Sequence, residues 1–306
     1  MALHLPMKTV FKKILLVAGI LPVLSCSVFH KAGPNLNKTA WIHGAADCKQ
    51  SVDPPIQVVQ YNANTWILRE SKCVHYEGPF MFLFIGHQRA LLMDDGATFD
   101  AKKFPLRVVV DSLIVNWEKA NNIQVALTIA HTHSHGDHTA GDGQFKDRPN
   151  TTVVGLKVDD VIAYFQLQNW PTQTGQINLG ERKLDIIPIP GHHATSIAVY
   201  DHETRILLSG DSFYPGRLYI KDWPAFKAST QRLTDFAAHH KISWILGNHI
   251  EMSKNPGVDY PIGSNYQPDE HILPLTVKDL VLLNETLKGM DKPERKVLND
   301  FIIYPI

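Results

Sequence analysis

Four of the sixteen histidines lie within the eight residues His131-Thr132-His133-Ser134-His135-Gly136-Asp137-His138. Imidazole nitrogens and carboxylate oxygens are ligands of zinc and related ions, and short His-rich tracts usually bind metal. The apolar, β-branched run over 125–130 comes directly before them and predicts a buried strand. Open α/β folds place their sites where strands end. The His-rich segment therefore indicates a metal site at the end of a strand rather than a solvated polar loop.

The spacing His133-x-His135-x-Asp137-His138 resembles the His-x-His-x-Asp-His signature of the metallo-β-lactamase superfamily. That resemblance implies that His133 and His135 bind one metal and that Asp137 and His138 bind a second. Gly136 is interpreted as the residue that lets a tight turn aim both pairs inward. His131 stands before the signature and is interpreted as the last residue of the strand rather than a ligand.

Three later segments resemble further motifs of the same family, in the same order along the chain. They are Pro190-Gly191-His192-His193-Ala194-Thr195-Ser196, Ser209-Gly210-Asp211 and Gly247-Asn248-His249. The resemblance places His192 on the first metal and makes Asp211 the carboxylate that bridges both metals. His249 completes the second site. His193 replaces the usual Thr or Ser and is an alternative ligand, and Asn248 intervenes where the family more often has glycine directly before the histidine.

Such a site implies two divalent cations, with Zn²⁺ favoured over Mn²⁺ or Fe²⁺ among N and O ligands without thiolate. Two metals about 3.5–4 Å apart can share a hydroxide that attacks a carbonyl. Asp137 is expected to act as both ligand and orienter of that nucleophile. The expected function is hydrolysis of an ester, thioester, lactone or lactam in a small-molecule substrate. Gly-x-Ser-x-Gly is absent, which excludes the α/β-hydrolase alternative.

Three other functions stay open. Gly210-Asp211-Ser212 resembles the Ala-Asp-Ser of one β-lactamase subclass, so a periplasmic zinc β-lactamase is the first alternative. The second alternative is a mononuclear iron oxygenase of the same fold, in which the Asp137-His138 pair would not bind metal. The third alternative is a non-catalytic binding lipoprotein. Such a protein would be expected to lack some of the metal-ligating residues, and none of them is missing from this sequence.

Residues outside the ligand set are also candidates. Asp94, in Met93-Asp94-Asp95-Gly96, resembles the Asp of a family turn and is expected to orient a ligand histidine through its other ring nitrogen, or else only to form the turn. Tyr214, Arg217 and Lys221 follow Asp211 on an expected loop, where Arg217 or Lys221 could receive a substrate carboxylate. A solvated loop is the alternative.

The predicted strands and helices that position these residues fall into two groups along the sequence. Strands are expected near 65–69, 81–86, 90–93, 125–130, 152–154, 183–189, 196–200, 205–209 and 243–246, and helices near 105–120, 159–168, 226–237 and 275–287. Periodicity does not distinguish a sandwich from a doubly wound sheet. The resemblance favours a four-layer αββα sandwich over residues 56–306.

The amino terminus is typical of an export signal. Lys8, Lys12 and Lys13 precede an apolar run that ends at Val23-Leu24-Ser25-Cys26 and resembles a bacterial lipoprotein processing site. We therefore expect a signal peptide over 1–26, lipidation of Cys26, a tether and lead-in loop over 27–55, and a periplasmic, lipid-anchored protein. Plain secretion and an uncleaved anchor are the alternatives.

The remaining cysteines and the overall charge narrow the class further. In an oxidising compartment Cys48 and Cys73 most simply form a disulfide, with two free thiols as the alternative. Thirty basic residues balance thirty acidic ones, and hydrophobic content is 44%. This composition describes an ordinary globular domain and disfavours nucleic acid as a partner, since that binding requires phosphate neutralisation. The sequence does not indicate an oligomeric state.

Overall fold

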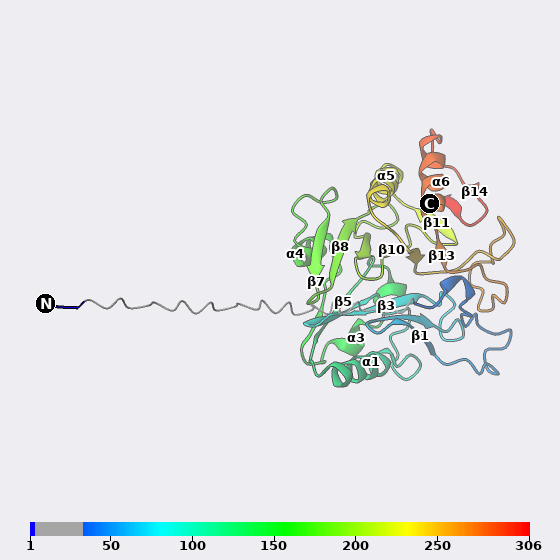
Figure 1. The fold of residues 1–306 in the computed structure, drawn as a ribbon. Coiled ribbons are helices and arrows are strands. Elements are labelled where there is room, and N and C mark those ends of the chain that lie inside the picture. The colour runs from blue at the N-terminus through cyan, green and yellow to red at the C-terminus, as the bar shows by residue number, and fades with distance from the viewer. Residues whose placement is uncertain (4–32) are drawn as a thin grey trace. The chain divides into compact units, whose positions relative to one another are not determined.

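Two six-stranded sheets form the framework of the described chain (Figure 1). The structure is a computed structural model that describes residues 1–3 and 33–306. Most of the predicted signal peptide, including Cys26, therefore lies outside the described residues. The first sheet contains, in spatial order, β1 (Ile56–Asn62), β2 (Thr65–Glu70), β3 (Phe80–Ile85), β4 (Arg89–Met93), β5 (Ala126–Ala130) and β6 (Thr151–Val153).

The second sheet has the spatial order β13 (Pro274–Leu275), β12 (Trp244–Gly247), β10 (Ile206–Gly210), β9 (Ile197–Asp201), β8 (Lys183–Pro188) and β7 (Gly175–Asn178). The helices are α1 (Leu106–Asn121), α2 (Gly136–Thr139), α3 (Asp142–Phe145), α4 (Val158–Phe165), α5 (Trp223–His239) and α6 (Val277–Lys288). The longer helices begin at polar caps: Asp222 accepts from the Ala225 amide, and Thr276 from the Asp279 amide.

Alternation along the strands divides the core into layers. In β3, Phe80, Phe82 and Phe84 pack in the cluster that holds the inward side chains of both sheets, such as Ile186 of β8. The intervening β3 residues pack with Val110 of α1 in a second cluster. Side chains on the other face of β8, β9 and β10 pack against α5 and α6. Figure 1 shows α1 and α3 on one side of the paired sheets and α5 and α6 on the other, which confirms the αββα prediction.

Strands that pair with partners far away in the sequence were not predicted. A separate three-stranded sheet contains β11 (Arg217–Ile220), β15 (Ile302–Pro305) and β14 (Lys296–Val297). The segment carrying Arg217 was expected as a loop, but it is a strand in register with Ile302. Its partner lies far away in the sequence, so local composition did not reveal it. The strands β1, β7 and β13 were not predicted either.

The segment predicted as a tether is partly integrated into the folded unit, which begins at Gly33. Leu36 and Trp41 are buried in the core between the sheets. A disulfide joins Cys48 to Cys73 in the loop between β2 and β3. These two buried apolar residues lie among turn-forming residues, and for that reason the composition of the segment indicated a loop. Among the described residues, no helix is long and apolar enough to cross a membrane.

Candidate metal centre

The seven predicted ligand side chains come from segments that follow the ends of strands in both sheets, with Asp137 and His138 in the short helix α2. β5 ends before the His133 to His138 segment, and β8, β10 and β12 end before His192, Asp211 and His249. Their donor atoms gather in two sets, in each of which every pair lies within 4.8 Å. The first set is His133, His135 and His192, and the second is Asp137, His138, Asp211 and His249. The structure thus brings together residues that span more than a hundred positions.

The first set consists of three imidazoles whose ring nitrogens face one another. His133 Nε2 lies 2.9 Å from His135 Nδ1, and His192 Nε2 lies 3.2 and 3.0 Å from those same two atoms. His133 and His192 are almost fully buried. His193 is not part of this set: its Nδ1 contacts the Thr195 hydroxyl at 2.8 Å.

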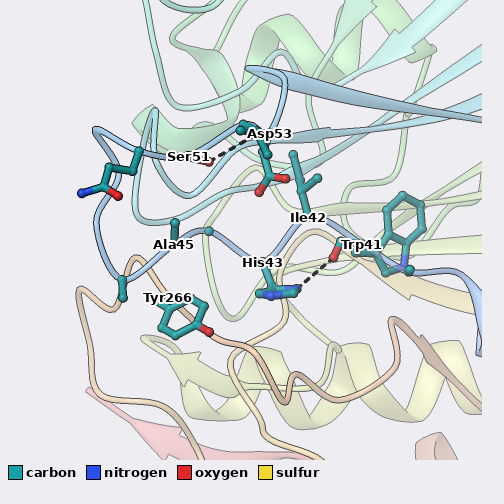
Figure 2. A pocket seen from close by; sticks show the side chains of 12 residues that line it. Trp41, Ile42, His43, Ala45, Ser51, Asp53 and Tyr266 are labelled. Carbon is teal, nitrogen blue, oxygen red and sulfur yellow. Dashed lines mark hydrogen bonds between the residues drawn. The ribbon is translucent and has the colours of Figure 1, made fainter.

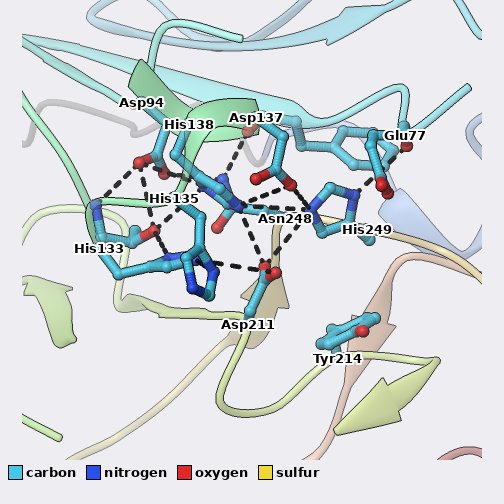
Figure 3. A network of polar contacts seen from close by, with 12 residues as sticks. Glu77, Asp94, His133, His135, Asp137, His138, Asp211, Tyr214, Asn248 and His249 are labelled. Carbon is cyan, nitrogen blue, oxygen red and sulfur yellow. Dashed lines mark hydrogen bonds and ion pairs between the residues drawn. The ribbon is translucent and has the colours of Figure 1, made fainter. Parts of the chain in front are cut away.

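The second set mixes two imidazoles with two carboxylates (Figure 3). Asp137 Oδ2 lies 3.4 Å from His138 Nε2 and 3.3 Å from His249 Nε2. The two imidazole Nε2 atoms are 3.4 Å apart. Asp211 Oδ1 lies 3.5 Å from His138 Nε2 and 3.4 Å from His249 Nε2.

Asp211 connects the two sets. Its Oδ1 faces the second set, while its Oδ2 lies 4.0 Å from His133 Nε2 and 3.8 Å from His192 Nε2. One carboxylate therefore presents an oxygen to each set, which is the arrangement required of a bridging ligand.

These donors fit divalent cations better than they fit one another. Tetrahedral bonds of about 2.0–2.2 Å place neighbouring donor atoms about 3.3–3.6 Å apart, close to the separations in the second set. Two facing ring nitrogens can share at most one proton, and three cannot satisfy one another. Asp211 Oδ1 is buried without a hydrogen-bond partner among the described residues. A buried oxygen that lacks a hydrogen bond and faces imidazole nitrogens fits the role of a cation ligand.

Protonation differs between the two sets when no cation is present. Burial lowers the pKa of His133, and the neighbouring imidazoles lower it further. Burial also lowers the pKa of His249, but the carboxylates of Asp211 and Asp137 outweigh it and raise that pKa to about 9. Burial raises the pKa of Asp137, yet His138 and His249 hold it far below its usual range. The first set therefore favours neutral imidazoles, and the second favours imidazolium paired with carboxylate.

Backbone carbonyls orient two of the imidazoles through the nitrogen that faces away from the centre. His192 Nδ1 lies 2.8 Å from the Tyr219 carbonyl oxygen, and His249 Nδ1 lies 3.3 Å from that of Glu77. A proton on Nδ1 donates to the carbonyl and leaves Nε2 free to bind a cation. The loop between β2 and β3, which carries Glu77, thereby becomes part of the support of the site.

Asp94 occupies the position predicted for an orienting carboxylate. Its Oδ1 lies 3.4 Å from His138 Nδ1 and accepts from the Thr132 amide at 2.8 Å. Its Oδ2 accepts from Asn248 Nδ2 at 2.7 Å, and Asn248 also donates to the Phe80 carbonyl at 2.6 Å. Sequence reasoning missed this role of Asn248, which it treated only as a departure from the family pattern. Its position directly before His249 was the one available signal.

Glycine roles differ from the expectation. An added Cβ at Gly136 would meet nothing within 4 Å, and its φ is not among the positive values, so it is not required for the turn. At Gly191, with φ of +147°, a Cβ would lie 2.5 Å from the Cα of Phe226. The close approach of α5, rather than the turn at Gly136, demands a glycine beside a ligand.

The expected substrate contacts are only partly supported. Arg217 is buried and donates to Glu251 Oε1 at 2.9 Å and to Asp259 Oδ2 at 2.6 Å. With its donors already used, it does not fit the predicted role of receiving a substrate carboxylate. Tyr214 is buried too, with its ring 5.8 Å from that of His249. Lys221 is exposed, and its amide donates to the Gly191 carbonyl at 3.0 Å, so its backbone lies beside the segment that carries His192.

A separate concavity lies away from these residues. It has a volume of about 520 Å³ and is lined by residues 40–46 and 50–53 together with Tyr266 (Figure 2). None of the predicted site residues lines it. It does not gather a second set of convergent donors, so the seven-residue centre is the candidate active site.

Comparison with known proteins identifies related sequences. The model of the metallo-beta-lactamase superfamily matches residues 127–280. Human acyl-coenzyme A thioesterase MBLAC2 is 29% identical over 184 residues, which cover 54% of this chain and 63% of that protein. Hydroxyacylglutathione hydrolase of Aeromonas hydrophila is 34% identical over 109 residues, covering 33% of this chain and 40% of the relative. The chain thus spans less than two thirds of the length of these curated relatives.

A solved structure shares the fold. The metallo-beta-lactamase from Pontibacter korlensis superposes with a TM-score of 0.50 at 17% identity, covering 77% of this chain and all of that one. At this identity the likeness concerns the fold alone.

Proposed function

This chain belongs to the metallo-β-lactamase superfamily, and from that premise we propose that it is a dizinc hydrolase that cleaves a thioester or a related acyl bond. The observation that carries the proposal is the position of Asp211, with one oxygen toward each donor set. The relatives are named acyl-coenzyme A thioesterase and hydroxyacylglutathione hydrolase, which supports a thioester as the target.

The chain supplies positioning and charge to this reaction. Two divalent cations bound in these sets would supply Lewis acidity and activate water as the nucleophile near neutral pH. Asp137 stays ionised because its pKa lies far below the usual range, so its carboxylate can accept a hydrogen bond from the attacking water and orient it. We propose that the exposed Lys221, whose amide bonds to the Gly191 carbonyl beside His192, meets an anionic part of the substrate.

A matched pair of variants and a substrate panel test the proposal. Protein purified without chelator should hold one zinc in each donor set, two equivalents for this centre, and hydrolyse acyl thioesters. His135→Ala should lose metal from the first set and with it the activity, while the half-exposed His87→Ala should change neither. Absence of hydrolysis after zinc loading, across thioesters, esters, lactones and nitrocefin, would overturn the proposal.

Two alternatives are outcomes of the same experiment. The sequence Gly210-Asp211-Ser212 is the feature that favours a β-lactamase, and turnover of nitrocefin well above every thioester would assign that function. One equivalent of iron with no hydrolysis would assign the oxygenase. The four convergent donors of the second set argue against it, because a mononuclear enzyme leaves them without a use.

We further propose export to the cell envelope with a lipid at Cys26. The disulfide between Cys48 and Cys73 supports an oxidising compartment. Palmitate labelling of the expressed full chain and membrane fractionation test the anchor. The Cys26→Ala variant should lose the label and leave the membrane fraction; an unlabelled parent protein in the soluble periplasmic fraction would contradict lipidation.

A further inference from the structure

Three more potential ligands lie together beside the centre: Asp95, His131 and Asp142. Their donor atoms all lie within 4.8 Å of one another. His131 Nε2 is 3.1 Å from Asp142 Oδ1. Asp95 follows β4, His131 follows β5 and Asp142 begins α3, so three segments of chain meet here. No role was predicted for Asp95 or Asp142, and His131 was interpreted only as the last residue of a strand.

The hydrogen bonding of this cluster is incomplete. Asp95 is fully buried, and its Oδ1 accepts from the Gly141 amide at 2.9 Å. Its Oδ2 has no hydrogen-bond partner among the described residues. Buried polar atoms are nearly always satisfied, so each such orphan in a native structure indicates an unseen partner.

The charges of the cluster are also uncompensated. Among residues 33–306, no lysine or arginine forms an ion pair with Asp95 or Asp142; His131 is the one basic group in contact. Two carboxylates facing each other in a buried site need a cation or a shared proton between them.

We propose that Asp95, His131 and Asp142 bind a divalent transition-metal cation, at a site separate from the seven-residue centre. Two oxygens and one imidazole nitrogen without thiolate are a donor set that suits Zn²⁺ or Mn²⁺. Bonds of about 2.0–2.2 Å place neighbouring ligands about 3 Å apart in octahedral and somewhat farther apart in tetrahedral geometry, which fits the 3.1 Å between His131 and Asp142.

A cation at this place stabilises the support of the centre rather than reacting with substrate. The Asp95 amide donates to the His138 carbonyl at 3.0 Å, and His131 stands two residues before His133. Crosslinking the ends of β4 and β5 to α3 would therefore hold the backbone from which ligands of both sets project. The role is structural, and the competing explanation is a proton shared between Asp95 and Asp142.

Metal stoichiometry and anomalous scattering decide between these explanations. The full chain, purified without chelator and loaded with zinc, should contain three equivalents, and the Asp142→Asn variant should contain two. Asp147→Asn, an exposed carboxylate in the same segment, should keep three. Crystals of the zinc-loaded parent protein should show an anomalous peak between the three side chains.

The outcomes are separable from the proposed function. His135→Ala should lose metal from the main centre and keep the peak at Asp142. If Asp142→Asn does not fold, the anomalous map of the parent protein decides alone. A map with peaks at the main centre and none between Asp95, His131 and Asp142 would overturn the inference and leave the hydrolase proposal intact.

Discussion

Asn248 donates from Nδ2 to Asp94 Oδ2 at 2.7 Å, and this one contact links the loop of His249 to the turn that orients His138 (Figure 3). Asp94 also contacts His138 Nδ1 at 3.4 Å with its other oxygen. Both side chains are completely buried. Two ligands of the second set, from different sheets, therefore share one buried support.

Replacing that support should weaken the second set alone. Asn248→Ala leaves Asp94 Oδ2 and the Phe80 carbonyl without their donor. Loss of such an outer partner typically costs roughly 10–100-fold in metal affinity. Zinc titration of the chelator-stripped variant should show that loss for one of the two sets. Asn284→Ala, which removes a buried amide between α6 and α5, is the control and should bind zinc like the parent protein. Equal affinities in all three proteins would contradict the assigned role of Asn248.

Gly191→Ala should displace His192. The new Cβ would lie 2.5 Å from the Cα of Phe226, and a backbone contact of that kind cannot be relieved by rotating a side chain. We expect impaired metal binding by the first set and reduced thermal stability, measured by zinc titration and by the melting temperature. Gly136→Ala has open space around its Cβ and should be neutral in both measurements. A Gly191→Ala protein with unchanged zinc affinity would show that α5 can shift at no cost.

Cation binding should release protons from the second set and not from the first. Without a cation, the pKa of His249 is raised to about 9 and that of His138 is raised as well, so both carry protons near pH 7. These protons must leave when the cation binds, and the affinity of this set should fall as pH falls, by up to roughly tenfold per unit for each proton. The first set has lowered pKa values and should bind without release.

Calorimetric zinc titrations in buffers of different ionisation enthalpy count those protons. Two binding phases with equal proton release, or with none, would contradict the electrostatic difference between the sets.

The pair of Arg182 and Asp201 should dominate stability at the other end of the sandwich. Arg182 donates to Asp201 at 3.0 and 2.7 Å and also bonds to the Ile85 carbonyl and the Thr65 hydroxyl, so it crosses from one sheet to the other. Asp201→Asn removes the closer counter-charge of a buried guanidinium and leaves only the Glu203 carboxylate at 3.7 Å. Breaking a buried ion pair typically costs about 3–5 kcal/mol. Urea unfolding measures that loss, with the exposed Asp269→Asn as a control that should change little.

The same pair has a defined pH dependence. Burial raises the pKa of Asp201, but Arg182 and the Thr204 hydrogen bonds outweigh it, so the folded pKa lies below the usual value. Its contribution to stability is therefore complete above the unfolded pKa, about 3.9, and disappears as pH falls through the folded pKa. Parent and Asp201→Asn stabilities should converge in that acidic range; a constant difference down to pH 2 would refute the assignment.

The disulfide should stabilise the folded unit. Cys48 and Cys73 are 25 positions apart, and closing a loop of that size contributes about 3 kcal/mol in the chain-entropy description. The double variant Cys48→Ser, Cys73→Ser should show that loss in urea unfolding, and a reductant should lower the stability of the parent protein but not of the variant. Equal stabilities of oxidised parent protein and variant would refute it.

The sequence by itself determined the ligand candidates and the layered fold. The residues His133 to His138 are close in the chain, so their spacing alone displays the chemistry of a metal site. Runs such as 126–130 are apolar and β-branched, so their burial as strands follows from local composition. The resemblance to one family then connected His192, Asp211 and His249 to that run before any geometry was known.

Tertiary structure alone decided which side chains support those ligands and which are already occupied. Asn248 meets Asp94 across 154 positions, and Arg217 meets Asp259 across 42. Asp95, His131 and Asp142 converge only because β4 and β5 end where α3 begins. Local sequence reports the preference of a residue for helix, strand or turn, whereas a polar side chain becomes a ligand, a support or a bystander through partners that only folding brings within bonding distance.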